Sequence, residues 1–191
     1  MTNQLTGVAN FIFELAQLRE KPRSGWELLK IPEKERVAPH VLRMTQLAYL
    51  LAIMEGHPDP NYVTMCALFH ENDETRLPDL NKVAARYVQQ VDKAGVVRDQ
   101  TAALGVAGEH IFAFWKETEE RRTDAGVIAK DADYLECAFT AKEYAEQGHD
   151  LASDWTKNVH AALKTNSARA LFDRMIIMDS NDWWQGLKKL S

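Results

Sequence analysis

The sequence predicts an all-α protein, organised as a single domain of roughly eight helices. The chain has 191 residues, and all six of its prolines lie before residue 79. The rest of the chain is therefore free of the residue that most disfavours helix interiors, and it is rich in Ala, Leu, Glu, Lys and Gln, which favour helices. No stretch alternates polar and apolar residues between turn residues, so we expect no sheet.

The first half of the chain predicts three helices, at residues 5–18, 40–54 and 61–72. Residues 5–18 carry apolar side chains three and four positions apart, which is the spacing of one helical stripe. An irregular connection follows at residues 21–39. The second helix is strongly apolar and ends at Gly56-His57-Pro58-Asp59-Pro60, a run of residues that break helices. The third is nearly apolar up to Phe69 and then becomes polar.

The second half predicts five more helices, at residues 79–94, 105–118, 126–147, 153–164 and 167–178. The first of these has Asp79 at its start, where an acidic side chain can cap the helix. The long helix 126–147 is expected to stop at Gly148, since glycine readily adopts the conformation that ends a helix. A tail with the pair Trp183-Trp184 closes the chain, either over the core or at a subunit interface.

Composition excludes several classes of protein. Hydrophobic residues make up 46% of the chain, too many for intrinsic disorder. The net charge of -5 gives no support for binding a nucleic-acid polymer or an anionic membrane. Apolar runs such as residues 48–54 are too short to span a bilayer, and no signal peptide precedes them. Cys66 and Cys137 lie in apolar helical stretches and are interpreted as small buried residues in a reducing compartment. We therefore expect a cytoplasmic protein.

The most informative feature is the abrupt change of character at residues 68–74 (LFHENDE). His70 and Glu71 point about 100° apart on a helix, so they can reach one ion only if other helices supply further ligands. His40, at the start of an apolar helix, and Asp133, within another, are suitable suppliers, and a buried unpaired carboxylate favours a cation partner. On residue pattern alone, a solvated or hydrogen-bonded His-Glu pair remains the alternative.

These residues resemble the H…HD…D pattern of the HD-domain phosphohydrolases, in the order His40, His70-Glu71, Asp133. Three blocks resemble the 5′-deoxynucleotidase-like group of that superfamily. Residues 23–26 (RSGW) with 37–40 (VAPH) resemble R-x-G-W…V-[SA]-x-H. Residues 70–80 (HENDETRLPDL) resemble HDxxExxxGD[IL], and residues 130–136 (KDADYLE) resemble K-x-x-D-x-x-E. The resemblance covers about residues 8–150 of a single HD-type domain spanning 1–191, with residues 151–191 adding C-terminal helices.

Two positions depart from the signature. Glu71 stands where the family has the Asp of its name; one extra methylene group still lets a carboxylate reach the ion if the helix end shifts. Pro78 stands where the family has Gly, and its fixed φ affects how Asp79 is presented.

The resemblance implies a role for each matched residue. His40, His70, Glu71 and Asp133 would hold one divalent metal ion, and a mixed imidazole and carboxylate set suits Mn, Fe, Co, Ni or Zn. Glu74 and Asp79 would be catalytic, assisting proton transfer and holding the sugar. Arg23 would neutralise the phosphate, and Trp26 would pack against the sugar and reject a ribose 2′-hydroxyl.

Plainer interpretations of the same residues stand beside these. Trp26 can be a loop aromatic packed on the core, and Arg23 a surface charge. Glu74 can belong to a solvated helix end. Asp131 and Glu136 are placed outside the set of metal ligands.

Three hypotheses about function follow. The first, which the resemblance implies, is a metal-dependent phosphohydrolase that removes the 5′-phosphate from deoxynucleoside monophosphates or similar small nucleotides, acting as a homodimer. The second is a catalytically degenerate HD domain that binds metal or nucleotide as a sensor or partner protein, which the two departures keep open. The third is a helical structural protein whose apparent ligands are coincidental.

Overall fold

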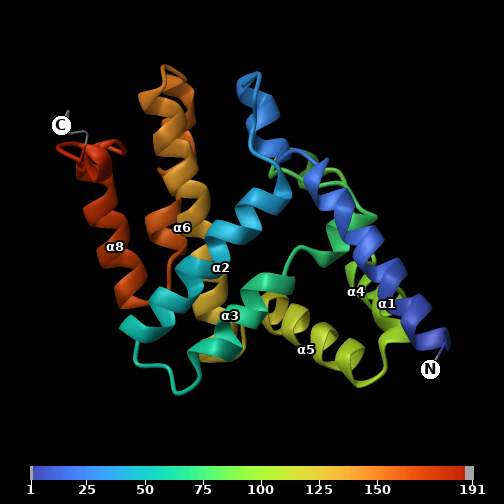
Figure 1. The fold of residues 1–191 in the computed structure, drawn as a ribbon. Helices are drawn as coiled ribbons and strands as arrows, with labels where there is room; N and C mark the ends of the chain where they lie inside the picture. The colour runs from blue at the N-terminus through green and yellow to red at the C-terminus, as the bar shows by residue number, and fades with distance from the viewer. Residues whose placement is uncertain (1, 188–191) are drawn as a thin grey trace.

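The computed structural model describes residues 2–187, whose regular structure consists of helices without a strand (Figure 1). The α-helices in this part of the chain are α1 (Thr2–Leu15), α2 (Val37–Met54), α3 (Pro60–Phe69), α4 (Lys93–Thr101), α5 (Val106–Glu120), α6 (Asp124–Glu146), α7 (Val159–Ala162) and α8 (Asn166–Ile177). Short 3-10 turns join several of them. The predicted all-α class is confirmed.

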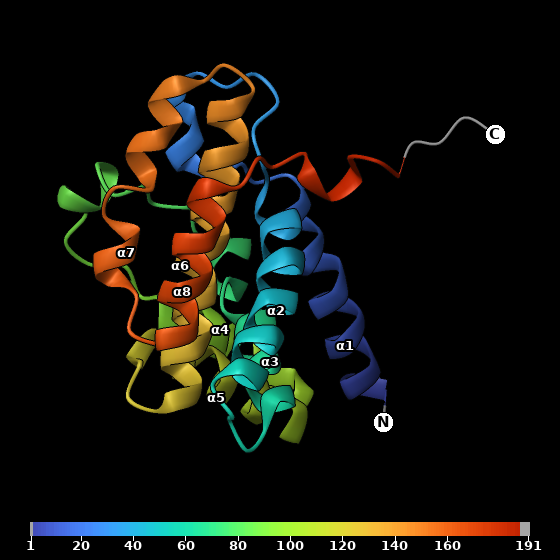
Figure 2. The ribbon, with the colours of Figure 1, turned by 90° about the vertical axis from the view of Figure 1, so that its left-hand side faces the viewer.

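Helix α6 is the centre of the packing. It contacts α2, α3, α5, α7 and α8, and it runs beside α8 in both views (Figures 1 and 2). Its buried face carries Ala129, Ala132 and Ala138, each fully buried. Small side chains let neighbouring helices approach closely, and the larger Met44, Leu51 and other buried side chains of α2 fill the space between them. Two of the metal-ligand candidates lie on α2 and α6, so this core determines how far apart they are.

Several helix starts are determined by side chains that accept a backbone hydrogen bond. Asp59 accepts from Tyr62 N at 3.0 Å, and Pro60 occupies the first turn of α3. Thr123 and Thr165 do the same at the starts of α6 and α8, accepting from Gly126 N and Ala168 N. These caps are local features, and the corresponding helices begin within three residues of the predicted positions.

The predicted helix 79–94 is wrong. Residues 79–92 form only a 3-10 turn, at Ala84–Arg86, and the helix of this region, α4, begins at Lys93 under an Asp92 cap. Asp79 caps no helix, because its carboxylate accepts a hydrogen bond from Ser24 N at 2.6 Å. The apolar side chains that suggested a helical face, such as Val83 and Tyr87, are exposed, so burial does not stabilise a helix here.

The predicted helix 153–164 is also divided. A 3-10 turn covers Asp150–Trp155, and α7 extends only over Val159–Ala162. The ring of Trp155 lies 5.6 Å from that of Trp26, which packs this turn on the N-terminal connection. Within that connection, residues 21–39, a 3-10 turn forms at Ser24–Leu29, and α2 begins at Val37.

Helix α2 meets the length and composition of a membrane span, a test that core helices of soluble proteins also pass. Its uninterrupted apolar run is far shorter, and its buried side chains pack on α3 and α6. Its other face exposes Leu42, Leu50 and Ile53. The two cysteines are free thiols on α3 and α6, with Cys66 buried and Cys137 half-buried.

Candidate metal centre and adjoining cavity

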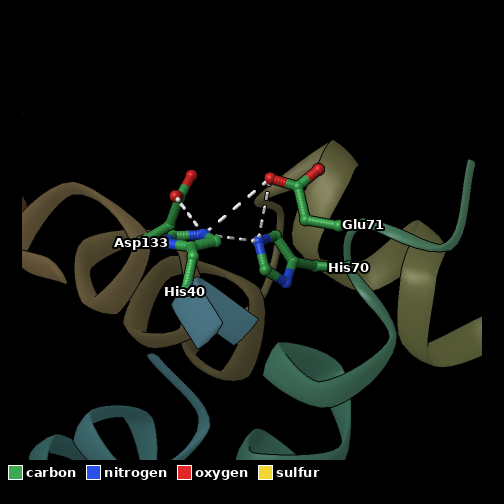
Figure 3. A group of neighbouring side chains, drawn as sticks. All are labelled: His40, His70, Glu71 and Asp133. Carbon is green, nitrogen blue, oxygen red and sulfur yellow. Dashed lines mark hydrogen bonds and ion pairs between the residues drawn. The ribbon is translucent and has the colours of Figure 1, made fainter. Parts of the chain in front are cut away.

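Four side chains from three elements converge in the interior (Figure 3). His40 projects from the first turn of α2, Asp133 from the middle of α6, and His70 and Glu71 from the chain just after α3 ends at Phe69. Each offers one ligand atom, and the four atoms lie within 4.8 Å of one another. All four residues are buried. The structure therefore brings together the complete ligand set that the resemblance implied.

Both imidazole rings turn their Nε2 atom toward the place where the four candidate ligand atoms meet. His70 Nδ1 lies 2.7 Å from the carbonyl oxygen of Ala67, and an oxygen of this kind can only accept, so Nδ1 carries the proton. His40 Nδ1 contacts the carboxylate of Glu136. The remaining Nε2 atoms face each other at 3.3 Å. Second partners of this kind fix the tautomer of metal-binding histidines.

The carboxylates complete the set of donor atoms. Asp133 Oδ1 lies 3.3 Å from His40 Nε2, and Glu71 Oε1 lies 3.3 Å from His70 Nε2. Two nitrogen and two oxygen donors facing one another in the interior require positive charge between them. Without an ion, burial opposes protonation of His40, but the hydrogen bonds of Asp133 and Glu136 raise its pKa to about 9. The donor set fits a divalent cation of the Mn-to-Zn series.

Glu71 reaches the cluster because it lies outside the helix. Its backbone (φ -103°, ψ 18°) departs from helical values, so the longer side chain is aimed by a turn. Arg23 Nη1 donates to Glu71 Oε1 at 2.7 Å. Burial alone would raise the pKa of Glu71, but His70 and Arg23 hold it well below its usual range. The carboxylate is therefore charged, as a metal ligand must be.

A second layer supports the ligands. Glu136, which we had placed outside the ligand set, accepts from Arg43 Nε at 2.8 Å while it contacts His40. Asp131 is structural, because it accepts backbone hydrogen bonds from Lys164 and Thr165. Lys130 Nζ lies 2.5 Å from Asp133 Oδ2. The sequence block that contains Lys130 was recognised, but this residue was given no role.

Glu74 lies beside the cluster in a 3-10 turn at Asn72–Thr75. The interpretation of Glu74 as a solvated helix end is wrong, because the residue is 4% exposed. Its Oε2 atom has no hydrogen-bond partner among the described residues. Burial, then the charges of Glu71 and Asp79, raise its pKa to about 10. Its carboxyl group is therefore protonated at neutral pH.

A cavity of about 690 Å³ opens from the centre to the surface. Arg23, Glu74 and Asp79 line it together with His70, Glu71 and Asp133. Trp26 also contributes to its wall but is only 2% exposed, packed edge-on against Tyr144 at 5.3 Å. The wall also includes Trp155 and Asn158 of the C-terminal segment, which lie outside the sequence blocks that carry the resemblance.

Comparisons with known proteins support the HD-domain resemblance. The family described as HD domain matches residues 15–174. The chain is 26% identical to 5′-deoxynucleotidase HDDC2 of Dictyostelium discoideum, over 71% of this chain and 76% of that protein. It is 24% identical to 5′-deoxynucleotidase PM0747 of Pasteurella multocida, over 72% and 74%. The solved structural-genomics protein APC5600 superposes with a TM-score of 0.78 at 33% identity, over 94% of this chain and 99% of that one.

Proposed function

Because this chain belongs to the HD domain family, we propose that it is a metal-dependent phosphohydrolase that removes the 5′-phosphate from deoxynucleoside monophosphates or similar small nucleotides. The observation that carries the proposal is the convergence of two imidazole nitrogens and two carboxylate oxygens at the base of a cavity that also contains Arg23. The two relatives described above, both named 5′-deoxynucleotidases, support the choice of substrate.

His40, His70, Glu71 and Asp133 would hold one divalent cation. When bound, such a cation supplies a Lewis acid for a phosphate oxygen and for the attacking water. Arg23 is already bonded to Glu71 and lies 3.6 Å from Asp133, so its guanidinium is positioned beside both carboxylate ligands. Its remaining N–H groups would neutralise the phosphate oxygens through charge-assisted hydrogen bonds.

Glu74 and Asp79 would carry the proton chemistry and the sugar contacts. Hydrolysis adds water across the P–O bond, so the leaving 5′ oxygen needs a proton. The buried carboxyl group of Glu74, whose Oε2 has no hydrogen-bond partner among the described residues, would donate it in its protonated form. Asp79, held by Ser24 N on the cavity wall, would accept a hydrogen bond from the sugar. Trp26 would limit the space beside the sugar and so reject a ribose 2′-hydroxyl.

The degenerate-domain hypothesis rests on the two departures from the family signature, and the structure does not favour it. Glu71, the first departure from the family signature, has its carboxylate within 3.8 Å of both Nε2 atoms. Asp79 follows the second departure, Pro78, and still lines the cavity. These two positions support the proposal of an active enzyme.

We further propose that the protein is a cytoplasmic homodimer that acts on small molecules, without a nucleic-acid polymer or a membrane as partner. The apolar face of α2 formed by Leu42, Leu50 and Ile53 is more than half exposed in the single chain. A second copy covering this face would remove it from water.

Phosphate release from a nucleotide panel tests the proposed activity. Protein loaded separately with Mn²⁺, Co²⁺ or Zn²⁺ is assayed with deoxynucleoside and ribonucleoside 5′-monophosphates and with 3′-monophosphates. The proposal predicts release from the deoxy 5′ compounds, and no release from the metal-free enzyme. Stoichiometric metal without release from any member of the panel would contradict it and support the sensor hypothesis.

A further inference from the structure

Besides Arg23, a second positively charged side chain, that of Lys130, lies in the cavity next to the candidate metal centre. Lys130 lies on α6 one turn before Asp133, and it lines the cavity together with Arg23. Arg23 approaches Asp133 at Oδ1, with its Nη2 at 3.6 Å, whereas Lys130 approaches Oδ2 at 2.5 Å. The two cations therefore contact opposite oxygens of the same carboxylate.

The carboxylate of Asp133 separates the two neighbouring positive groups. Figure 3 shows one of its oxygens turned toward His40 and the other turned away. The first is Oδ1, 3.3 Å from His40 Nε2. The ion pair with Lys130 is made by the other oxygen, Oδ2, so Oδ1 is the oxygen that faces His40. Lys130 is thus immediately adjacent to the metal centre without being a ligand.

The ammonium group of Lys130 has donors to spare. Its side chain is 17% exposed, and Asp133 is the only carboxylate within 4.0 Å of Nζ among residues 2–187. The ring of Tyr134, 5.5 Å away, holds the ammonium from one side but accepts no full hydrogen bond. An ammonium group carries three N–H donors, and Asp133 uses one of them. Lys93 also lines the cavity and is paired with a buried aspartate, Asp73, at 3.0 Å, but Asp73 is not one of the candidate metal ligands.

Charge balance indicates what these donors are for. The carboxylates of Glu71 and Asp133 would neutralise a divalent ion, so the loaded centre carries no net charge. A phosphomonoester brings between one and a half and two negative charges, as a phosphorylated side chain does. Arg23 supplies one compensating charge, and Lys130 is the next cation that faces the same cavity from beside the ligands.

We propose that Lys130 is a phosphate-binding residue, which together with Arg23 holds the phosphate group on either side of Asp133. The proposal rests on the proposed function in that it assigns the phosphate to this cavity. It specifies that the preferred group is a terminal, doubly charged phosphate, because a diester with a single charge needs only one of the two cations.

Inorganic phosphate is the probe, titrated calorimetrically into Co²⁺-loaded protein at low ionic strength, with bound cobalt measured in every sample. Lys130→Met removes the charge, and Lys130→Arg keeps it. Lys142→Met is the matched control, because Lys142 also lies on α6, also forms an ion pair one turn away, with Glu146, and also has a side chain that is 17% exposed. Lys142 does not line this cavity.

Lys130→Met is expected to retain cobalt and to bind phosphate about 10- to 100-fold more weakly, the scale of one lost charge-assisted hydrogen bond. Lys130→Arg should stay within about 5-fold of the parent protein, and Lys142→Met should be unchanged. Unaltered phosphate affinity in Lys130→Met would overturn the proposal, as would failure of the parent protein to bind phosphate. Loss of cobalt from Lys130→Met would also overturn it, because Lys130 would then serve only to hold Asp133.

The binding experiment and the nucleotide assay fail independently. Phosphate binding that depends on Lys130 without turnover of any nucleotide supports this inference and contradicts the proposed function. Turnover of nucleotides together with phosphate binding that does not depend on Lys130 supports the proposed function and contradicts this inference.

Discussion

Two neighbouring acidic residues in the turn after α3 are both buried but have different partners. Asp73 faces α4 and α5: its Oδ1 accepts from Trp115 Nε1 at 2.9 Å, and its Oδ2 lies 3.0 Å from Lys93 Nζ. Glu74 lines the cavity. One oxygen of each residue, Asp73 Oδ2 and Glu74 Oε2, makes no hydrogen bond among the described residues, but only Asp73 has an ion-pair partner there. Asp73 is thus tied to α4 and α5, whereas Glu74 faces the space that we propose for the substrate.

The difference shows how a chain can place catalytic and structural acids side by side. The 3-10 turn directs successive side chains to different faces, so one face packs on the helices and the other lines the cavity. A buried carboxyl group without a partner lowers stability, and such groups gather at functional sites. Variants of the metal ligands, Glu74 and Asp73 test this difference.

The largest effect is expected from His70→Ala, on the cavity side. Three remaining ligands make a poor chelate, so the variant should lose bound metal while circular dichroism shows an intact helical fold. Asp133→Ala should behave in the same way. Full metal occupancy in either variant would show that the replaced residue is not a metal ligand.

Glu74→Ala is expected to keep the metal and lower turnover by about 10²-fold or more, the usual scale for a general acid or base. Asp73→Ala provides the contrast. It leaves the indole N–H of buried Trp115 unpaired, which should lower the free energy of unfolding by about 1–3 kcal/mol. Its turnover per folded molecule should change little. If the two variants exchanged these effects, the assignment of the two faces would be wrong.

Stability of the metal-free protein should depend on pH through Glu74. Burial raises its pKa from 4.5 to about 10, so between these values the folded state holds a proton that the unfolded state has released. Stability therefore falls as pH rises through this range. Glu74→Gln should raise the melting temperature relative to the parent protein, and more at pH 8 than at pH 5. An equal change at both pH values would show that Glu74 is not protonated in the fold.

The smallest effect is expected from Glu71→Asp, which shortens the side chain by about 1.5 Å. Because the turn already places the longer side chain at the cluster, we expect metal affinity to be unchanged or modestly weaker in a competition assay. Glu71→Gln keeps the length and removes the charge, so it should lose more affinity. A large gain of activity in Glu71→Asp would mean that the natural site is damaged.

How much could be predicted from sequence depended on whether local pattern and burial agreed. Helix α6 was predicted almost to its ends because its cap, its length and its buried alanines all favour the same structure. Residues 79–94 have a helical pattern, but Asp79 bonds to Ser24 and Tyr87 is exposed, so long-range contacts decided the outcome.

The candidate site divides in the same way. The four ligand candidates could be named from their order and types, because the resemblance covers short, ordered blocks. Lys130 and Glu136 could not be assigned, since their roles depend on which oxygen or nitrogen of a neighbour they contact. The far wall of the cavity, with Trp155 and Asn158, lies beyond those blocks, and only the fold brings it to the site.

Anomalous diffraction from crystals grown with Mn²⁺ tests the central claim most directly. The claim predicts one strong peak, within about 2.0–2.3 Å of His40 Nε2, His70 Nε2 and one oxygen each of Glu71 and Asp133. The second Asp133 oxygen should remain on Lys130. A peak at another place would contradict the account. So would crystals grown with Mn²⁺ that show no peak between these four residues.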